Sequence, residues 1–192
     1  GPGDEVITAP NSWISSASCI ALRGGKPVFV DVGQDMNIDP AGIEAAITSK
    51  TRAILPVHLT GRCANMDAVL EVAGRHDLQV IEDAAQAVGA RYRDRVAGSM
   101  GAIGCFSLHP LKNLNAMGDA GIIVTDDDAI ADKLRLLRNH GLRTRDDVGF
   151  WGFNSRLDTV QAAVLNCRLG ILEDVTVARR RNAERYRAGL KK

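Results

Sequence analysis

The chain has 192 residues, of which 45% are hydrophobic and 24% are charged, and both fractions are ordinary for a globular protein. Its formal net charge of +1 excludes the strong basic field that is typical of nucleic-acid or anionic-membrane binding. No apolar run approaches membrane-spanning length, and the first residues lack the features of a signal peptide. We therefore expect a cytoplasmic protein that binds neither nucleic acid nor membrane.

The cysteines give no indication of a metal site or a disulfide framework. None of the four forms a CxxC pair, and no histidine lies at zinc-ligand spacing from one. We expect free thiols in a reducing compartment. The cysteines are Cys19, Cys63, Cys105 and Cys167.

Short β-branched runs alternate with helical patterns through most of the chain. This alternation is typical of an α/β layered domain with a mostly parallel sheet. After about residue 126 no further strand is expected. The expected strands are 5–8, 27–31, 53–57, 79–82, 104–107 and 121–125.

Helices are expected where apolar residues recur at helical spacing. Asp39-Pro40 indicates a helix start, because Asp accepts from free amides and proline has a preset φ. Apolar stripes at 66–73 and 130–137 indicate two more helices, and the second is expected to end at 139–141.

Two helical patterns are expected near the end of the chain. An Arg-rich amphipathic stretch covers about 173–190, and its Arg179-Arg180-Arg181 run is expected to be a solvated face. The pattern before it predicts one apolar face, formed by Leu157, Val160, Val164 and Cys167.

The segment 80–86 is typical of a buried strand that ends in an acid, Asp83. In open α/β sheets, ligands gather at the carboxyl ends of the strands, which favours a binding role for Asp83. The alternative is that Asp83 caps a following helix.

Three other positions have a chemical and a structural interpretation. Lys112 lies on a glycine-flanked loop and is either a solvated surface lysine or an imine-forming amine. Trp13 either packs in the core or offers its π face to a planar ring. For Asn154 and Ser155, the structural interpretation is that one of them is the N-cap of the helix that follows.

In this order and combination, the motifs resemble the DegT/DnrJ/EryC1/StrS family of sugar aminotransferases. The resemblance implies pyridoxal phosphate as cofactor and the three-layer α/β/α large domain of the type I pyridoxal-phosphate fold. The matching segments are 1–7, 27–31, 56–59, 81–89, 104–113, 118–125, 138–141 and 154–163.

The resemblance also implies residue roles. Lys112 is similar to the lysine that carries the cofactor, Asp83 to the acid that pairs with the pyridine nitrogen, and Gln86 to the residue beside the ring hydroxyl. An acid in that place favours a protonated ring, which stores electrons better.

Further roles concern the phosphate and the ring face. Ser107 is similar to a phosphate-binding serine, and Trp13 to an aromatic that stacks on the ring. Asn154 resembles a residue that reaches the phosphate of the neighbouring subunit's cofactor, which implies a homodimer with shared active sites.

The implied reaction is transfer of an amino group from glutamate to a keto group of a nucleotide-linked sugar, as in polysaccharide biosynthesis. Relatives with histidine in place of the lysine are dehydratases, so Lys112 favours transamination. A sugar dehydratase and a catalytically silent, partner-binding module are the alternatives. A Rossmann-type site is disfavoured, because the glycines at 98–104 precede a strand instead of following one.

Family chains extend beyond both ends of this one. We expect residues 1–170 to form a partial, cofactor-binding large domain, and residues 171–192 to form a helix that leads toward a small C-terminal domain. We also expect the 192-residue chain to be inactive by itself, because an upstream phosphate-binding segment has no counterpart in it.

Overall fold

The computed structural model describes residues 1–190 and separates into two compact units. Unit 1 comprises residues 1–106 and 122–156, and unit 2 comprises residues 107–121 and 157–192. Residues 191 and 192, the last two of the C-terminal segment expected at 171–192, lie outside the described residues.

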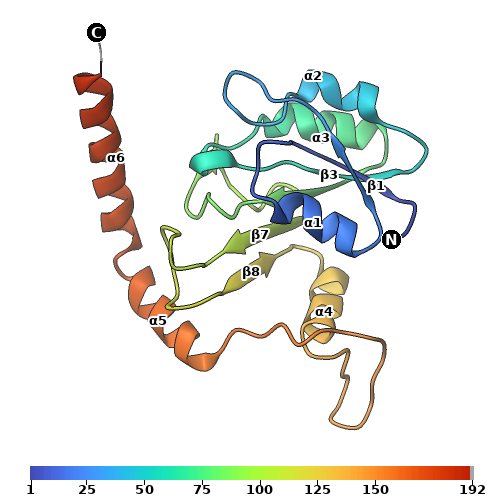
Figure 1. The fold of residues 1–192 in the computed structure, drawn as a ribbon. Helices are drawn as coiled ribbons and strands as arrows, with labels where there is room; N and C mark the ends of the chain where they lie inside the picture. Colours follow the sequence, from blue (N-terminus) through green and yellow to red (C-terminus); the bar gives the residue numbers. More distant parts are fainter. Residues whose placement is uncertain (191–192) are drawn as a thin grey trace. The chain divides into compact units, whose positions relative to one another are not determined.

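A six-stranded sheet in the order β2-β1-β3-β4-β7-β8 is the centre of the fold (Figure 1). β1 pairs in parallel with β2 and β3, β3 with β4, and β4 with β7. The prediction of a mostly parallel sheet is therefore confirmed, and each expected strand is present within two residues of its predicted bounds. The strands are β1 Glu5–Thr8, β2 Lys26–Phe29, β3 Thr51–Leu55, β4 Gln79–Asp83, β7 Ile103–Ser107 and β8 Gly121–Val124.

β8 runs opposite to β7, as its hydrogen bonds show. At one end the Leu108 N–H donates to the Ala120 carbonyl, and at the other the Thr125 hydroxyl donates to the Ala102 carbonyl. The connection 108–120 contains no helix, whereas the crossover between parallel strands usually does. No strand follows β8 in the part of the chain that the structure describes, as expected.

Helices cover both faces of the sheet, with α1 on one face and α2 and α3 on the other (Figure 1). Alternate side chains of a strand point to opposite faces, so each face has its own apolar cluster. Ile54 packs on the α3 side with Val69, whereas Leu55 packs on the α1 side with Ile20. The expected layered architecture is confirmed. The helices of this unit are α1 Ser15–Leu22, α2 Pro40–Ile43, α3 Met66–Arg75 and α4 Asp128–Leu137.

The predicted helix signals act as expected. Asp39 accepts a hydrogen bond from the Ala41 N–H at the start of α2, which continues as a short 3-10 turn, Glu44–Ala46. α4 ends before His140 and Gly141, whose φ values of 60° and 75° stop the helix.

Two elements were not expected from the sequence. Helix α1 has a serine-rich first turn and no side-chain hydrogen bond at its N-cap, so it lacks both an apolar stripe and a start signal. A two-stranded hairpin, β5 Arg91–Tyr92 and β6 Arg95–Val96, is too short to produce a periodic pattern.

Unit 2 contains the loop 107–121 and two helices, α5 Thr159–Leu169 and α6 Leu172–Gly189. The apolar face predicted for α5 is wrong: Leu157 precedes the helix, Val160 is 73% exposed, and the buried residue is Leu165. α6 covers the expected Arg-rich stretch and has no buried residue.

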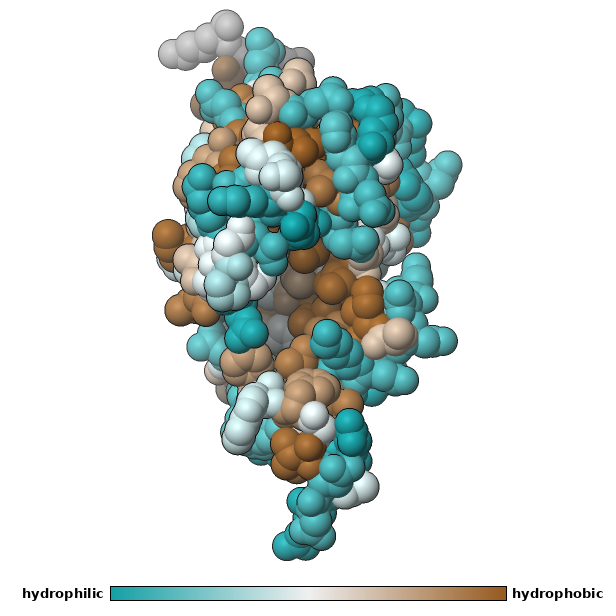
Figure 2. Space-filling view, turned by 90° about the vertical axis from the view of Figure 1, so that its right-hand side faces the viewer, coloured by the Kyte–Doolittle hydropathy of each residue, from teal (hydrophilic) through white to brown (hydrophobic). Residues whose placement is uncertain are grey.

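Large hydrophobic side chains remain exposed on unit 1. Leu22 is 83% exposed and Trp151 is 95% exposed. Figure 2 shows hydrophobic residues among the hydrophilic ones on one face of the molecule. Among residues 1–190, no helix combines the length and the apolar character that crossing a membrane requires.

Candidate active site

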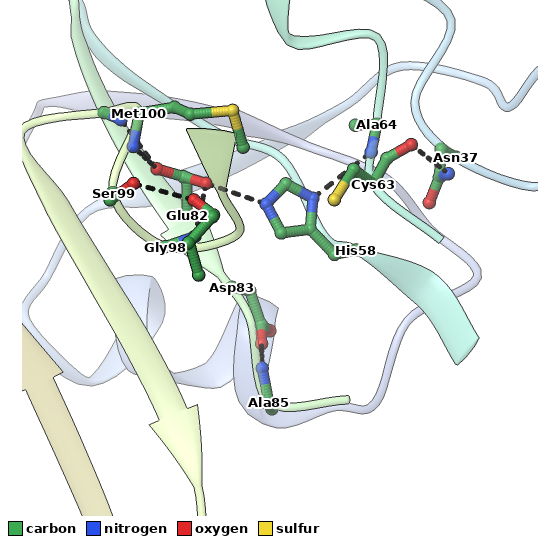
Figure 3. Close-up of polar contacts among 12 residues, drawn as sticks. Asn37, His58, Cys63, Ala64, Glu82, Asp83, Ala85, Gly98, Ser99 and Met100 are labelled. Carbon is green, nitrogen blue, oxygen red and sulfur yellow. Dashed lines mark hydrogen bonds and ion pairs between the residues drawn. The ribbon is translucent and has the colours of Figure 1, made fainter. Parts of the chain in front are cut away.

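Asp83 is the last residue of β4, at the carboxyl end of the sheet. One carboxylate oxygen, Oδ2, accepts from the Ser16 hydroxyl at 2.7 Å. The other, Oδ1, accepts from the Ala85 N–H at 3.1 Å (Figure 3). Residues 84–90 form turns and not a helix, so the helix-cap interpretation of Asp83 is wrong. The carboxylate retains acceptor capacity for a further N–H group.

Ser16 is a site residue that the sequence analysis missed. It lies on α1, is 5% exposed, and its Oγ is 2.7 Å from the Ser12 Oγ. Ser15 and Ala17 beside it give Ser16 no distinguishing local signal, and its burial is evident only once α1 is placed. The two serines extend the polar contacts of Asp83 along one side of the helix.

Gln86 lies three residues beyond β4 and has a fixed amide orientation. Its Oε1 accepts from the Thr60 N–H at 2.6 Å, in a turn where Thr60 has φ 55°. A backbone N–H can only donate, so the contacting atom must be the amide oxygen. Gln86 is therefore left with its –NH₂ group as the donor that it offers to a ligand.

Trp13 is 75% exposed, so the core-packing interpretation is wrong. Its carbonyl accepts from the Ser16 N–H at 3.0 Å, which ties it to the start of α1. The same short segment therefore positions an open aromatic face and the hydroxyl that contacts Asp83. An exposed indole face is suited to stacking on a planar ring.

Glu82, beside Asp83 on β4, points into a buried polar network with His58 (Figure 3). Both side chains have no exposed surface, and the His58 Nε2 is 2.8 Å from Glu82 Oε2. The same carboxylate accepts from the backbone N–H groups of Gly98, Met100 and Gly101 at 2.6–2.7 Å. Glu82 thus holds the loop 98–101 against the sheet.

The surroundings of Glu82 lower the pKa of its carboxyl. Burial alone raises that pKa, but the hydrogen bonds from His58 and from three backbone N–H groups together outweigh burial. The sequence analysis gave no role to either residue. The available signal was an acid that directly follows the apolar pair Val80-Ile81 within a strand, since such an acid must find donors if it is buried.

A cavity of about 300 Å³ lies on the α1 side of the sheet. Asp83, Cys19 and Cys105 are in its walls, whereas Trp13 and Gln86 are not. Burial raises the pKa of the Cys105 thiol to about 11, and the nearby Asp83 charge adds to that effect. The thiol is therefore protonated near neutral pH and is a poor nucleophile.

Within unit 2, Ser107 and Lys112 lie on one loop that is organised around His109. The His109 N–H donates to Ser107 Oγ at 3.4 Å, and the Lys112 N–H donates to the His109 carbonyl at 2.9 Å. The His109 Nδ1 accepts from the Leu111 N–H at 3.2 Å. Lys112 is half-buried at the end of this turn.

Asn154, in unit 1, is exposed and forms an isolated bridge with Asn139. Its Oδ1 accepts from the Arg156 Nε at 2.9 Å. Helix α5 begins at Thr159 with Asp158 at the N-cap, so the helix-cap interpretation of Asn154 and Ser155 is wrong.

The structure groups the predicted residues within each unit. In unit 1, Trp13 and Asp83 are both linked to Ser16, and Gln86 follows Asp83 on the same turn segment. No hydrogen bond connects Asn154 to these residues among the contacts described for unit 1. In unit 2, one loop contains both Ser107 and Lys112.

Relatives of known annotation cover almost the whole chain. A protein of Geobacillus stearothermophilus named pleiotropic regulatory protein is 49% identical over 97% of this chain and 50% of its own length. The dTDP-3-amino-3,4,6-trideoxy-alpha-D-glucose transaminase of Streptomyces venezuelae is 47% identical over 99% of this chain and 50% of its own length. The chain thus spans about half the length of these curated relatives.

Solved structures agree with these relatives. A DegT DnrJ EryC1 StrS aminotransferase from Brucella abortus superposes with a TM-score of 0.96 at 40% identity, over 100% of this chain and 54% of that one. The ntda structure from Bacillus subtilis with bound cofactor PMP superposes with a TM-score of 0.83 at 39% identity, over 90% of this chain and 40% of that one. The family match extends over residues 1–192, and the chain belongs to the DegT/DnrJ/EryC1/StrS aminotransferase family.

Proposed function

We propose that this chain forms the cofactor-binding part of a pyridoxal-phosphate-dependent aminotransferase. The enzyme transfers an amino group from glutamate to a keto group of a nucleotide-linked sugar. The observation that carries the proposal is Asp83, an acid at a strand end with two fixed donors and room for a third. Family membership over residues 1–192 supports the same cofactor, since aminotransferases of this family depend on pyridoxal phosphate.

The chemistry of the donor set in unit 1 fits the cofactor. Bound pyridoxal phosphate supplies an electron sink for the substrate carbon. Asp83 would accept from the pyridine N–H of the cofactor, and its negative charge would favour the protonated ring. The free –NH₂ group of Gln86 would donate to the ring oxygen of the cofactor, and the exposed Trp13 indole would cover one face of its ring.

Lys112 and Ser107 supply the remaining functions from their loop. The Lys112 amine is the group that would hold the cofactor through its aldehyde and would serve as a general base. The Ser107 hydroxyl donates to the phosphate. The hydrogen-bonded turn around His109 holds the backbone between these two residues.

The proposed assembly is a cytoplasmic homodimer with shared active sites. Asn154 serves the phosphate of the partner's cofactor, and its exposure in unit 1 is consistent with that role. The four cysteines are free, as expected for a reducing compartment.

The test is to load the purified intact protein with pyridoxal phosphate, record its absorption spectrum, reduce it with borohydride and map the labelled peptide. We expect a visible-edge imine band and a label on Lys112. A label on another lysine contradicts only the role assigned to Lys112 and not the proposed function. Absence of both the band and amino transfer from glutamate to a keto-sugar nucleotide contradicts the proposed function.

A further inference from the structure

The Ser16 hydroxyl connects helix α1 to the acid of the proposed site. Ser16 is 5% exposed and lies 2.7 Å from Asp83 Oδ2. The Ser12 hydroxyl lies 2.7 Å from Ser16 Oγ on the other side. This chain of contacts is not needed to build the helix, whose hydrogen bonds are made by the backbone.

The directions of these hydrogen bonds are determined by the number of protons. A carboxylate can only accept, so Ser16 uses its single O–H proton on Asp83. Ser16 Oγ is then an acceptor toward its other neighbour, and Ser12 must be the donor in that contact. The Ser12 proton therefore fixes the Ser16 rotor in the orientation that serves Asp83.

The two contacts of Asp83 act on different oxygens. The Ala85 N–H holds Oδ1 and the Ser16 hydroxyl holds Oδ2, so the plane of the carboxylate is fixed at both ends. Terminal sp³–sp² torsions such as χ2 of Asp are otherwise broad. Without the hydroxyl, the carboxylate is free to turn about the single remaining bond from Ala85.

We propose that Ser16 is a positioning residue that acts through Asp83, with Ser12 orienting it. Ser16 holds the carboxylate in the orientation that accepts the pyridine N–H and thereby keeps the ring nitrogen protonated. This inference rests on the proposed function. Because the Ser16 N–H also donates to the Trp13 carbonyl, the segment from Trp13 to Ser16 at the start of α1 sets both the ring face and the acid at the ring nitrogen.

The test uses the intact protein loaded with pyridoxal phosphate that is ¹⁵N-labelled in the ring. Ser16→Ala is compared with the wild type by ¹⁵N NMR and by steady-state kinetics. We expect the ring-nitrogen signal to move toward its unprotonated position, kcat to fall on the order of tenfold, and KM for the amino donor to change much less. Ser16→Thr, which keeps the hydroxyl, should restore both readouts.

Ser18→Ala is the matched control, because two residues along a helix turn the side chain by about 200°, away from Asp83. It should leave both readouts unchanged. If Ser16→Ala does not fold, Ser16→Cys replaces it, since a thiol keeps the volume but donates weakly.

An unchanged ring-nitrogen signal in the folded Ser16 variant overturns the inference, even if kcat falls, because the loss is then structural. A wild type that binds the cofactor with an unprotonated ring nitrogen also overturns it. A wild type that binds no pyridoxal phosphate overturns the proposed function, and this inference with it.

Discussion

The buried carboxylate of Glu82 predicts a large stability loss for Glu82→Gln. Oε1 accepts from the N–H groups of Met100 and Gly101, and Oε2 accepts from the Gly98 N–H and contacts His58. Each oxygen is therefore surrounded by two donors. Whichever oxygen becomes the –NH₂ group of glutamine, two donors lose their acceptor: the part-buried N–H groups of Met100 and Gly101, or the buried donors of Gly98 and His58.

The magnitude follows from those lost contacts. A buried donor that is left unsatisfied costs about 1–3 kcal/mol. Two such donors lower the free energy of unfolding by on the order of 2–6 kcal/mol. A shift of the loop 98–101 that gives the donors new partners reduces this loss. A typical domain is stable by about 5–15 kcal/mol, so the variant loses a large fraction of its stability.

His58 cannot relieve this loss by changing its tautomer. Its Nδ1 accepts from the Ala64 N–H at 3.2 Å, so a neutral ring has its proton on Nε2 and donates to Glu82. Moving the proton to Nδ1 would let Nε2 accept from the new amide. It would also place a donor against the Ala64 N–H, and one unsatisfied pair would replace another.

The assay is urea-induced unfolding of the intact protein at neutral pH, analysed for the free energy of unfolding. Glu71→Gln is the matched control: Glu71 makes an exposed (i, i+4) ion pair with Arg75, and its loss should change the free energy by less than about 1 kcal/mol. A change of less than about 1 kcal/mol for Glu82→Gln would refute the reasoning.

The pH dependence of the stability loss in Glu82→Gln tests whether the charged form of the Glu82 carboxyl is the stabilising one. The folded pKa of Glu82 lies below its ordinary value of 4.5, so the carboxylate contributes stability fully above that pH. This contribution is lost as the pH falls through the folded pKa. The difference between wild type and variant should therefore be largest near neutral pH and should shrink in acid. A difference that grows in acid would show that the charged form is not the stabilising one.

The remaining predictions concern the proposed site. Asp83→Asn keeps the shape of the side chain but removes the negative charge at the ring nitrogen. The activation free energy should therefore rise by about 2–4 kcal/mol, while cofactor affinity changes little. Near-full activity in steady-state kinetics would contradict the role of Asp83. Borohydride mapping should label Lys112, and a label on Lys26, Lys50 or Lys133 would contradict that assignment. Lys112→Ala and Asn154→Ala should complement after subunit exchange, since mixed dimers contain one intact site; no recovery, with exchange confirmed by mass, would place Asn154 in its own subunit's site or in a purely structural role.

Local sequence was sufficient for the sheet and for most helix boundaries. Strand runs such as 5–8 are short, contain β-branched residues and are bounded by turn residues, so the local sequence alone predicts them. Asp39-Pro40 specifies a helix start through its own side-chain chemistry. Helix α1 was missed because it is held by packing on the sheet and has no helical apolar period of its own.

The order of the motifs was also sufficient to identify the family and the position of Asp83 at a strand end. Its environment was not predictable in the same way. Ser16 and Asp83 are 67 residues apart in sequence, and their 2.7 Å contact exists only because β4 and α1 are brought together by the sheet.

Tertiary structure likewise decided the different roles of two adjacent acids. Glu82 and Asp83 are neighbours on β4, and the strand pleat sends their side chains to opposite faces. On one face Glu82 meets His58 and the loop 98–101 and is satisfied inside the protein. On the other, Asp83 meets the Ser16 hydroxyl and retains acceptor capacity for a ligand. Residue type alone cannot separate these roles, because they depend on which donors the folded chain brings to each carboxylate.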